Sequence, residues 1–167
     1  AQTPPLTKVA IAVQRVSTGE HWNGAGWVPT ETWLTAAGTA SWSYVLPPLG
    51  SDGDYHLRAR AWAEETDDPS PAEVMFTYDA TPPEPTTLIA PVGGVEIAAL
   101  PELLLEWDDV GPNGGSDISY RIELDDQSFA TSSAHYTTHV GEGAHQWRVQ
   151  VGDAADNVSG WTAWETF

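Results

Sequence analysis

Apolar residues recur at every second position in six segments spread along this chain. One such stripe runs through Val9, Ile11 and Val13. Alternation with a period of two is typical of β-strands that bury one face, whereas helices repeat their apolar positions every 3.6 residues. The sequence therefore predicts an all-β protein. Further stripes are Leu57, Ala59, Ala61; Val74, Phe76, Tyr78; Leu103, Leu105, Trp107; Tyr120, Ile122, Leu124; and Trp147, Val149, Val151.

A proline-rich segment separates the expected strands into two groups. Asp79–Pro85 carries three prolines within four residues. Proline lacks an N–H and fixes φ, so this segment is excluded from a central strand and is stiffened toward polyproline II. We expect one domain over residues 1–80, a second over 86–167, and a semi-rigid linker over 79–86. A chain of 167 residues accommodates two small sandwich domains.

A weak internal repeat supports this division. Gly53–Ala61 aligns without gaps with Gly143–Val151, at an offset of 90 residues given by positions 53 and 143. Arg58 and Arg148 coincide in the alignment, and the positions expected to face inward are apolar in both copies. One strand repeated at the length of one domain predicts two related sandwiches.

The repeated strand resembles the penultimate strand of fibronectin type III and immunoglobulin-like domains. There, a leucine precedes a tyrosine corner and an alternating strand, and Leu49 stands six residues before Tyr55. His145 takes the place of the corner tyrosine in the second half. The resemblance therefore does not imply a corner hydrogen bond there.

Each half also has its own resemblance. The second half is similar to fibronectin type III domains, and the first half resembles the bacterial immunoglobulin-like repeats of large surface and secreted proteins. Both imply β-sandwiches and an extracellular or cell-surface location, but a sandwich fold does not fix a function. The segments that carry the resemblance are Pro101–Trp107, Tyr120–Leu124, Trp147–Val149, Asp153–Ser159 and a final strand Trp161–Phe167 in the second half, and Trp22–Trp27, Trp42–Tyr44 and Tyr78–Pro82 in the first.

The charge balance restricts the expected partners. Six Lys and Arg residues stand against 24 Asp and Glu, a formal net charge of −18. Such a surface repels phosphate backbones and anionic membranes, so no nucleic acid is expected as a partner. It suits cations, basic partners or high salt; the alternative is that it only keeps a secreted protein soluble.

Two absences from the sequence limit the remaining possibilities. The chain has no cysteine, which excludes disulfides and thiolate metal sites. It has no apolar run near the roughly 20 residues of a membrane helix, so no membrane insertion is expected. The start, Ala1–Pro5, has neither a basic region nor an apolar stretch, and we expect a mature terminus or a cut from a longer chain.

Acidic loops make Ca²⁺ the one candidate cofactor. Hard cations take several oxygen ligands that converge from a loop. The alternative is that Asp and Asn side chains cap these turns without a metal, and no EF-hand spacing is present. The candidate ligands are Asp153, Asp156, Asn157, Asp79, Asp67 and Asp68, with Glu64 and Glu65 beside the last two.

Tryptophan is unusually frequent, with nine residues. Trp107 and Trp147 fall on apolar stripes and are expected in the core. Trp22 and Trp27 flank an Asn-Gly turn, where exposed coplanar rings would stack on a glycan or a partner. The alternative is that these rings staple hairpins and cover the ends of the sandwich.

Other polar residues are expected to be structural. Lys8, the only lysine, falls on the outward face of its strand. His135 and His139 would lie about 13 Å apart on a strand, too far for one zinc ion, and are expected at a surface edge. Asp125 and Asp126 are expected to form a hairpin turn.

No catalytic motif is present: there is no Gly-x-Ser-x-Gly elbow, His-Glu-x-x-His pair, phosphate loop or dinucleotide fingerprint. We therefore expect a non-catalytic extracellular structural or adhesive module, a spacer or interaction segment of a larger cell-surface or secreted protein, with calcium as a candidate stabiliser. Its partners would be other domains of the same chain or neighbouring protein subunits.

Two alternatives stay open. One is a carbohydrate-binding accessory module of a secreted hydrolase. The other is a subunit of an extracellular filament, in which the segment Ala1–Leu6 would pair with an open sheet edge of a neighbour.

Overall fold

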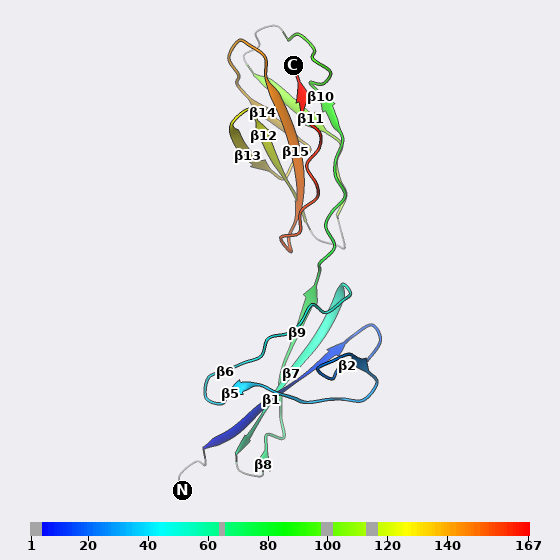
Figure 1. The fold of residues 1–167 in the computed structure, drawn as a ribbon, viewed down its shortest axis with the longest axis vertical. Coiled ribbons are helices and arrows are strands. Elements are labelled where there is room, and N and C mark those ends of the chain that lie inside the picture. Colours follow the sequence, from blue (N-terminus) through cyan, green and yellow to red (C-terminus); the bar gives the residue numbers. More distant parts are fainter. Residues whose placement is uncertain (1–4, 64–65, 98–101, 113–116) are drawn as a thin grey trace. The chain divides into compact units, whose positions relative to one another are not determined.

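The computed structural model describes residues 5–63, 66–97, 102–112 and 117–167. Within these ranges the regular secondary structure is entirely β, which confirms the all-β prediction (Figure 1). The chain divides into two compact units, Ala1–Asp79 and Ala80–Phe167. None of the described residues belongs to a helix long and apolar enough to cross a membrane.

Three long antiparallel strands form the framework of the first unit. β1 (Leu6–Arg15) pairs with β7 (Gly53–Ala63), and β7 also pairs with β9 (Ala72–Tyr78). These are the strands that the apolar stripes predict. Four short strands extend the sheet and two more form a separate hairpin: β2 (His21–Trp22), β3 (Trp27–Val28), β4 (Leu34–Thr35) and β8 (Thr66–Asp67), then β5 (Ala37–Gly38) with β6 (Trp42–Ser43).

The first unit thus has one large sheet and a small hairpin, not two sheets of similar size. The chain between β3 and β7 is rich in Gly, Pro, Ser and Thr and has little apolar alternation, so it covers the sheet mainly as irregular backbone. It supplies Leu49, which is buried with Ile11, Val13 and Tyr55 in the core. Partly buried side chains complete this core: Trp22, Trp27, Leu34, Tyr44, Leu46, Leu57, Ala59, Phe76 and Tyr78.

Strand β1 is buried on both faces. All five residues from Val9 to Val13 are at most 3 % exposed. The alternation predicts burial of Val9, Ile11 and Val13 but says nothing of Ala10 and Ala12, which point to the opposite side of the sheet. That side is therefore covered by other side chains.

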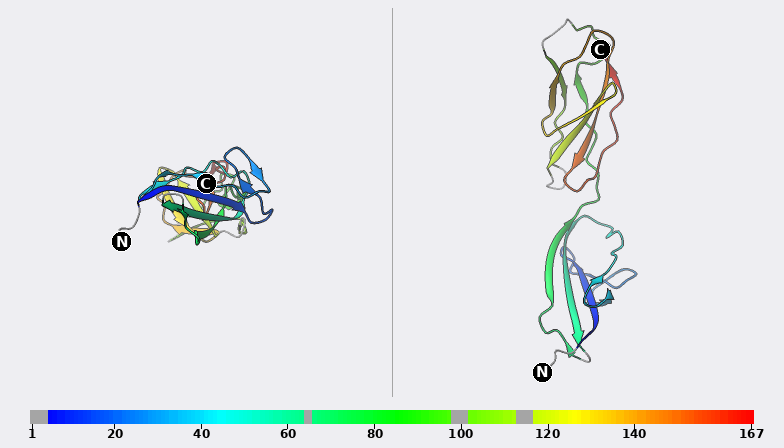
Figure 2. Two further views of the ribbon diagram at one scale, coloured as in Figure 1. Left: turned by 90° about the horizontal axis from the view of Figure 1, so that it is seen from below. Right: turned by 90° about the vertical axis from the view of Figure 1, so that its left-hand side faces the viewer.

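The second unit consists of two antiparallel sheets (Figure 1, Figure 2). Both contribute to a core of nine buried residues, and these nine are the three apolar stripes predicted for this half, including Trp107 and Trp147. The three-stranded sheet has the order β10 (Leu88–Ala90), β11 (Leu103–Trp107), β14 (His135–Thr138); the four-stranded sheet has the order β13 (Gln127–Thr131), β12 (Ile118–Leu124), β15 (Gln146–Asp153), β16 (Glu165–Thr166).

Turns and edges of the second unit follow the sequence closely. Asp125 and Asp126 form the two-residue turn between β12 and β13, and Asp125 has a φ of 49°, as hairpin turns of this length require. β14 lies at the edge of its sheet, and His135 and His139 are exposed there, as predicted. The final strand is shorter than the resemblance implies, because only Glu165–Thr166 of residues 161–167 forms a strand.

Each unit has a corner hydrogen bond at the aligned position. The Tyr55 hydroxyl donates to the Ser51 carbonyl oxygen at 2.6 Å. In the second unit, His145 Nε2 lies 3.1 Å from the Gly141 carbonyl oxygen. Both bonds span four residues, so the histidine forms the corner bond that the resemblance alone did not imply.

Candidate functional site

Every basic side chain of the protein lies over a tryptophan ring. The chain has six Lys and Arg residues, and the distance from each cation to its nearest ring centroid is between 4.3 and 5.7 Å. These distances are within the range of cation–π attraction. The nearest pairs are Lys8–Trp62, Arg15–Trp27, Arg58–Trp33, Arg60–Trp33, Arg121–Trp161 and Arg148–Trp164.

In the first unit, cations and tryptophan rings form one group on the outer face of β7, which we call the stack of the first unit. Arg58, Arg60 and Trp62 stand at alternate positions and so share one face of the strand. Trp33, which directly precedes β4, lies 4.5 Å from the Arg60 guanidinium and 5.6 Å from that of Arg58. Lys8 of β1 lies 4.4 Å from the Trp62 ring, in agreement with its predicted outward position.

Carboxylates fix the arginines of this stack. Arg58 forms an ion pair with Glu31, and Arg60 Nη1 donates to Asp67 Oδ2 at 2.8 Å. In the sheet, Arg58 lies opposite Ala12. The stack therefore covers the face to which the small side chains of β1 point, and this explains why β1 is buried on both sides.

The stack of the second unit lies on the outer face of its four-stranded sheet. Arg148 on β15 is 4.5 Å from the ring of Trp161 and 4.4 Å from that of Trp164. Arg121 on β12 is 5.7 Å from Trp161. Arg148 Nε donates to Glu123 Oε2 at 2.7 Å, and these two residues are directly opposite in the sheet.

Two hydroxyl residues hold the tryptophans of this stack in place. The Ser159 N–H donates to the Val151 carbonyl oxygen at 2.8 Å, while Ser159 Oγ accepts the Val151 N–H at 2.9 Å. Thr162 repeats both bonds with Val149, at 2.9 and 3.1 Å. Residues 159–162 are thus held against β15 by four hydrogen bonds, although they form no regular strand. We call these four bonds the clasp.

The spacing between residues 159 and 164 is the sequence feature from which the stack of the second unit could have been predicted. Ser159 and Thr162 are three residues apart, as are Trp161 and Trp164. A period of three is typical of polyproline II, in which residues i and i+3 share a face. The expected final strand Trp161–Phe167 is therefore wrong for residues 161–164, because only Glu165–Thr166 forms a strand. A strand would place Trp161 and Trp164 on opposite faces, whereas both rings contact Arg148.

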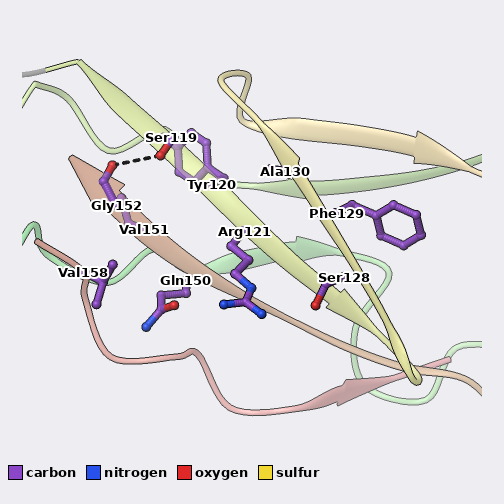
Figure 3. A pocket seen from close by; sticks show the side chains of 10 residues that line it. All are labelled: Ser119, Tyr120, Arg121, Ser128, Phe129, Ala130, Gln150, Val151, Gly152 and Val158. Atoms are coloured by element: carbon purple, nitrogen blue, oxygen red, sulfur yellow. Dashed lines mark hydrogen bonds between the residues drawn. The ribbon is translucent and has the colours of Figure 1, made fainter. Parts of the chain in front are cut away.

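A groove of about 370 Å³ lies on the same outer face, across β12, β13 and β15. Figure 3 shows Arg121, Gln150, Ser128 and Val158 on the groove side of the sheet, whereas Phe129 points away. None of the described residues that line the groove carries a carboxylate. These donors suit a neutral or anionic group, but residues 80–167 carry two basic and fourteen acidic residues, a formal charge of −12 that opposes anions.

The loop after β15 satisfies its own polar groups. Asp153 is 7 % exposed, and its Oδ1 accepts the backbone N–H groups of Ala155 and Asn157, both at 2.9 Å. Asn157 Nδ2 donates to Asp153 Oδ2 at 3.1 Å. Asp156 is exposed with a φ of 65°. This arrangement is the capped turn that was the alternative to a calcium site.

The other candidate calcium ligands lie in the first unit. Asp67 pairs with Arg60, and Asp68 Oδ1 accepts the Ser70 N–H at 2.9 Å. Asp79 follows β9 directly. Glu64 and Glu65 lie outside the described residues. In the described ranges, no three His, Asp or Glu side chains are grouped closely enough to hold a metal ion.

Trp22 and Trp27 face each other across the β2–β3 hairpin. Their ring centroids are 5.6 Å apart and their planes are inclined by 59°. Both rings are half-buried and pack against the core, and Trp27 also contacts Tyr55 and Arg15. The rings are not the coplanar platform that glycan stacking requires, and their contacts favour the hairpin-stapling alternative.

His145 forms polar contacts through both of its ring nitrogens. Its Nδ1 lies 2.7 Å from Asp125 Oδ2, and both its ring nitrogens face oxygen acceptors, so only the protonated imidazolium supplies both N–H groups. The hydrogen bond to Asp125 raises the pKa of His145. Burial raises the pKa of Asp125, but hydrogen bonds from His145 and from the Gln146 N–H outweigh it and lower that pKa. This pair ties the β12–β13 turn to β15.

Comparison with known proteins gives structural but not sequence relatives. No protein-family model and no curated protein sequence matches the chain. A solved structure of the fibronectin(III)-like modules of CbhA from Clostridium thermocellum is 19 % identical, with a TM-score of 0.54 over 97 % of this chain and 77 % of that one.

Two further structures have lower scores. The FN1–FN3 domains of chicken CNTN1 are 12 % identical, with a TM-score of 0.40 over 99 % of this chain and 57 % of that one. A cytokine receptor complex is 14 % identical, with a TM-score of 0.38 over 98 % and 87 %. At such identities a likeness shows the fold alone. The 3 + 4 strand arrangement of the second unit and the CbhA match together show that this chain has a fibronectin type III-like fold.

Proposed function

We propose that this chain is a non-catalytic extracellular structural or adhesive module, a spacer or interaction segment of a larger cell-surface or secreted protein. The observation that carries the proposal is the use of all six basic residues in stacks on tryptophan. Five of these side chains cover the outer faces of sheets, and the sixth, Arg15, lies over Trp27, which packs against the core of the first unit. In both places they stabilise the shape of the unit. A fibronectin type III-like fold fits such a role.

The second unit's groove supports a non-catalytic role. Acid–base catalysis needs a titratable group that faces the bound substrate with a perturbed pKa. Among the described residues that line the groove, Arg121 is the one charged residue, and arginine does not exchange its proton in proteins. Tyr120 also lines the groove, and burial raises the pKa of its hydroxyl. The residues whose pKa is shifted are held by structural partners: Tyr120 donates to Asp109 and accepts from the Val110 N–H, and His145 joins Asp125.

The stability of the outer faces provides the test. Purified chain should be a monomer that unfolds reversibly and hydrolyses no polysaccharide, peptide or ester above the rate of buffer. Replacing Arg148 by Ala should lower the free energy of unfolding of the second unit while solubility and secondary structure are kept. Turnover of any substrate that disappears in Arg121→Ala would show an active site at the groove and refute the proposal.

Calcium binding is a separable part of the proposal. If the acidic loops hold Ca²⁺, EDTA should lower the melting temperature of the chain and Ca²⁺ should restore it. Asp153→Asn is the informative variant because Asp153 is the most buried of the described candidate ligands, and it should reduce the effect of EDTA if it binds the ion. Asp126→Asn is the control, since Asp126 is exposed and is not a candidate ligand. A melting curve that EDTA leaves unchanged removes calcium from the proposal and keeps the structural role.

A further inference from the structure

On the outer faces of the sheets, one tryptophan ring contacts fewer cations than the others. Among the described residues, Trp164 contacts a single cation, Arg148, and is 38 % exposed. Trp27 also contacts a single cation, Arg15, but it packs against the core of the first unit. The other three rings on the outer faces of the sheets contact two cations each. These are Trp33 with Arg58 and Arg60, Trp62 with Lys8 and Arg60, and Trp161 with Arg121 and Arg148.

The second unit has no basic residue left to complete this stack. Residues 80–167 contain two cations, Arg121 and Arg148, and both already lie over Trp161. Fourteen acidic residues surround them in the sequence of this unit. A net charge of −12 attracts cations and accelerates their encounter with the surface.

We propose that Trp164 receives an arginine or lysine side chain of a basic partner protein, and that this contact docks the outer face of the four-stranded sheet onto that partner. Arginine fits best, since its planar guanidinium stacks on aromatic faces and is weakly hydrated. Five of the six stacked cations in this chain are arginines. The proposal deepens the adhesive role above and rests on it.

Two features of the geometry support a protein partner of this kind. Trp164 is held by the Thr162 clasp and by Arg148, so its ring is ordered before binding and loses little side-chain entropy. The groove on the same outer face offers hydrogen-bonding groups, among them Ser128 and Gln150, to other polar groups of the partner. Tryptophan and arginine are also the residues most often found at the centre of protein interfaces.

The test uses the full 167-residue chain and a labelled peptide of six arginines separated by glycines. Fluorescence anisotropy should show binding at low salt that weakens as salt increases. Trp164→Ala should raise Kd roughly two- to fivefold, the loss expected for one exposed cation–π contact. Trp164→Phe should retain part of the affinity, because a phenyl ring also attracts a cation, although less strongly than an indole ring.

Trp42→Ala is the matched control, since Trp42 is 41 % exposed and the described residues place no cation over it. It should leave Kd unchanged. A peptide with citrulline in place of arginine keeps length and planarity but loses the charge, and it should not bind.

Three results would overturn the proposal. Equal Kd values for the Trp164→Ala and Trp42→Ala variants would show a diffuse attraction to the acidic surface. Undiminished binding of the citrulline peptide would exclude a cation site. Binding of a neutral oligosaccharide that needs Trp164 and displaces the peptide would assign the ring to sugar. None of these results concerns catalysis, so the module's non-catalytic role is tested separately by the turnover assay.

Discussion

The two units form the same corner bond with different residues. In the first unit, a fully buried Tyr55 donates one neutral hydrogen bond to Ser51. In the second, His145 bonds to Gly141 and also to the Asp125 carboxylate. The position of the bond is therefore common to both units, but the second unit adds a charged link to a neighbouring turn. The repeat preserves an interaction that its residue identities do not reveal.

The aligned arginines differ in a similar way. Arg58 and Arg148 occupy equivalent positions, and each is paired with a glutamate, Glu31 or Glu123. Arg58 contacts one tryptophan ring, whereas Arg148 contacts two, at 4.5 and 4.4 Å. The second unit depends more on Arg148 because its outer face has two cations, Arg121 and Arg148, whereas that of the first unit has three, Lys8, Arg58 and Arg60.

The largest expected effect separates these two arginines. Arg148→Ala removes two ring contacts and the Glu123 pair, and should lower the free energy of unfolding of the second unit by about 2 kcal/mol. Arg58→Ala removes one longer ring contact and one pair, and should cost the first unit about 1 kcal/mol. Urea denaturation followed by tryptophan fluorescence measures both. Equal losses would show that the ring contacts contribute nothing beyond the ion pairs.

The corner residues should differ by less. His145→Phe removes the bonds to Gly141 and Asp125 and should destabilise the second unit by about 1.5 kcal/mol, whereas Tyr55→Phe removes one hydroxyl bond and should cost about 1 kcal/mol. The same denaturation assay applies. His145→Gln, which keeps one donor, is expected between the wild type and His145→Phe. A loss in Tyr55→Phe that exceeds that of His145→Phe would contradict the comparison.

Loss of the Thr162 hydroxyl bond, one of the bonds that hold the stack of the second unit, should lower the free energy of unfolding by a similar or slightly smaller amount. Thr162→Val keeps the shape of the side chain and leaves the Val149 N–H without its acceptor, at a cost of about 1 kcal/mol or less. Thr137→Val is a suitable control because Thr137 is exposed on β14. If both substitutions have the same effect on unfolding, the tryptophans of the second stack are held by the sheet and not by the clasp.

The core of the second unit could be predicted from the sequence because burial on one face imposes a period of two. The first unit follows this pattern less closely, since Val74 is 52 % exposed and the buried Leu49 belongs to no stripe. The stripes of the second half are buried residue for residue.

The contacts on the outer faces were harder to predict. Alternation along a strand shows which side chains point outward, but it does not show which residues cover them. Trp33 reaches Arg60 from 27 residues away in the sequence, and no local pattern encodes that contact. Only the three-residue spacing of Trp161 and Trp164 carried a local signal.

The smallest expected effect is a dependence on pH that only the second unit's corner has. The raised pKa of His145 means that its contribution to stability is fully present below the unfolded value of 6.5 and is lost as pH rises through the folded value. The lowered pKa of Asp125 means that its contribution is present above 3.8 and is lost as pH falls through the folded value.

The second unit's corner should therefore be most stabilising between those two pH values, by less than about 1 kcal/mol because the pair is partly exposed. The decisive quantity is the difference in free energy of unfolding between wild type and His145→Phe, measured by urea denaturation from pH 5 to pH 8. That difference should shrink as pH rises, whereas the difference between wild type and Tyr55→Phe should stay constant, because a hydroxyl and a carbonyl exchange no proton in this range. A constant difference for His145→Phe would mean that the pKa of His145 is the same in the folded and the unfolded chain, so that the Asp125 contact does not favour the protonated imidazolium. The corners of the two units would then not differ in the pH dependence of their contributions to stability.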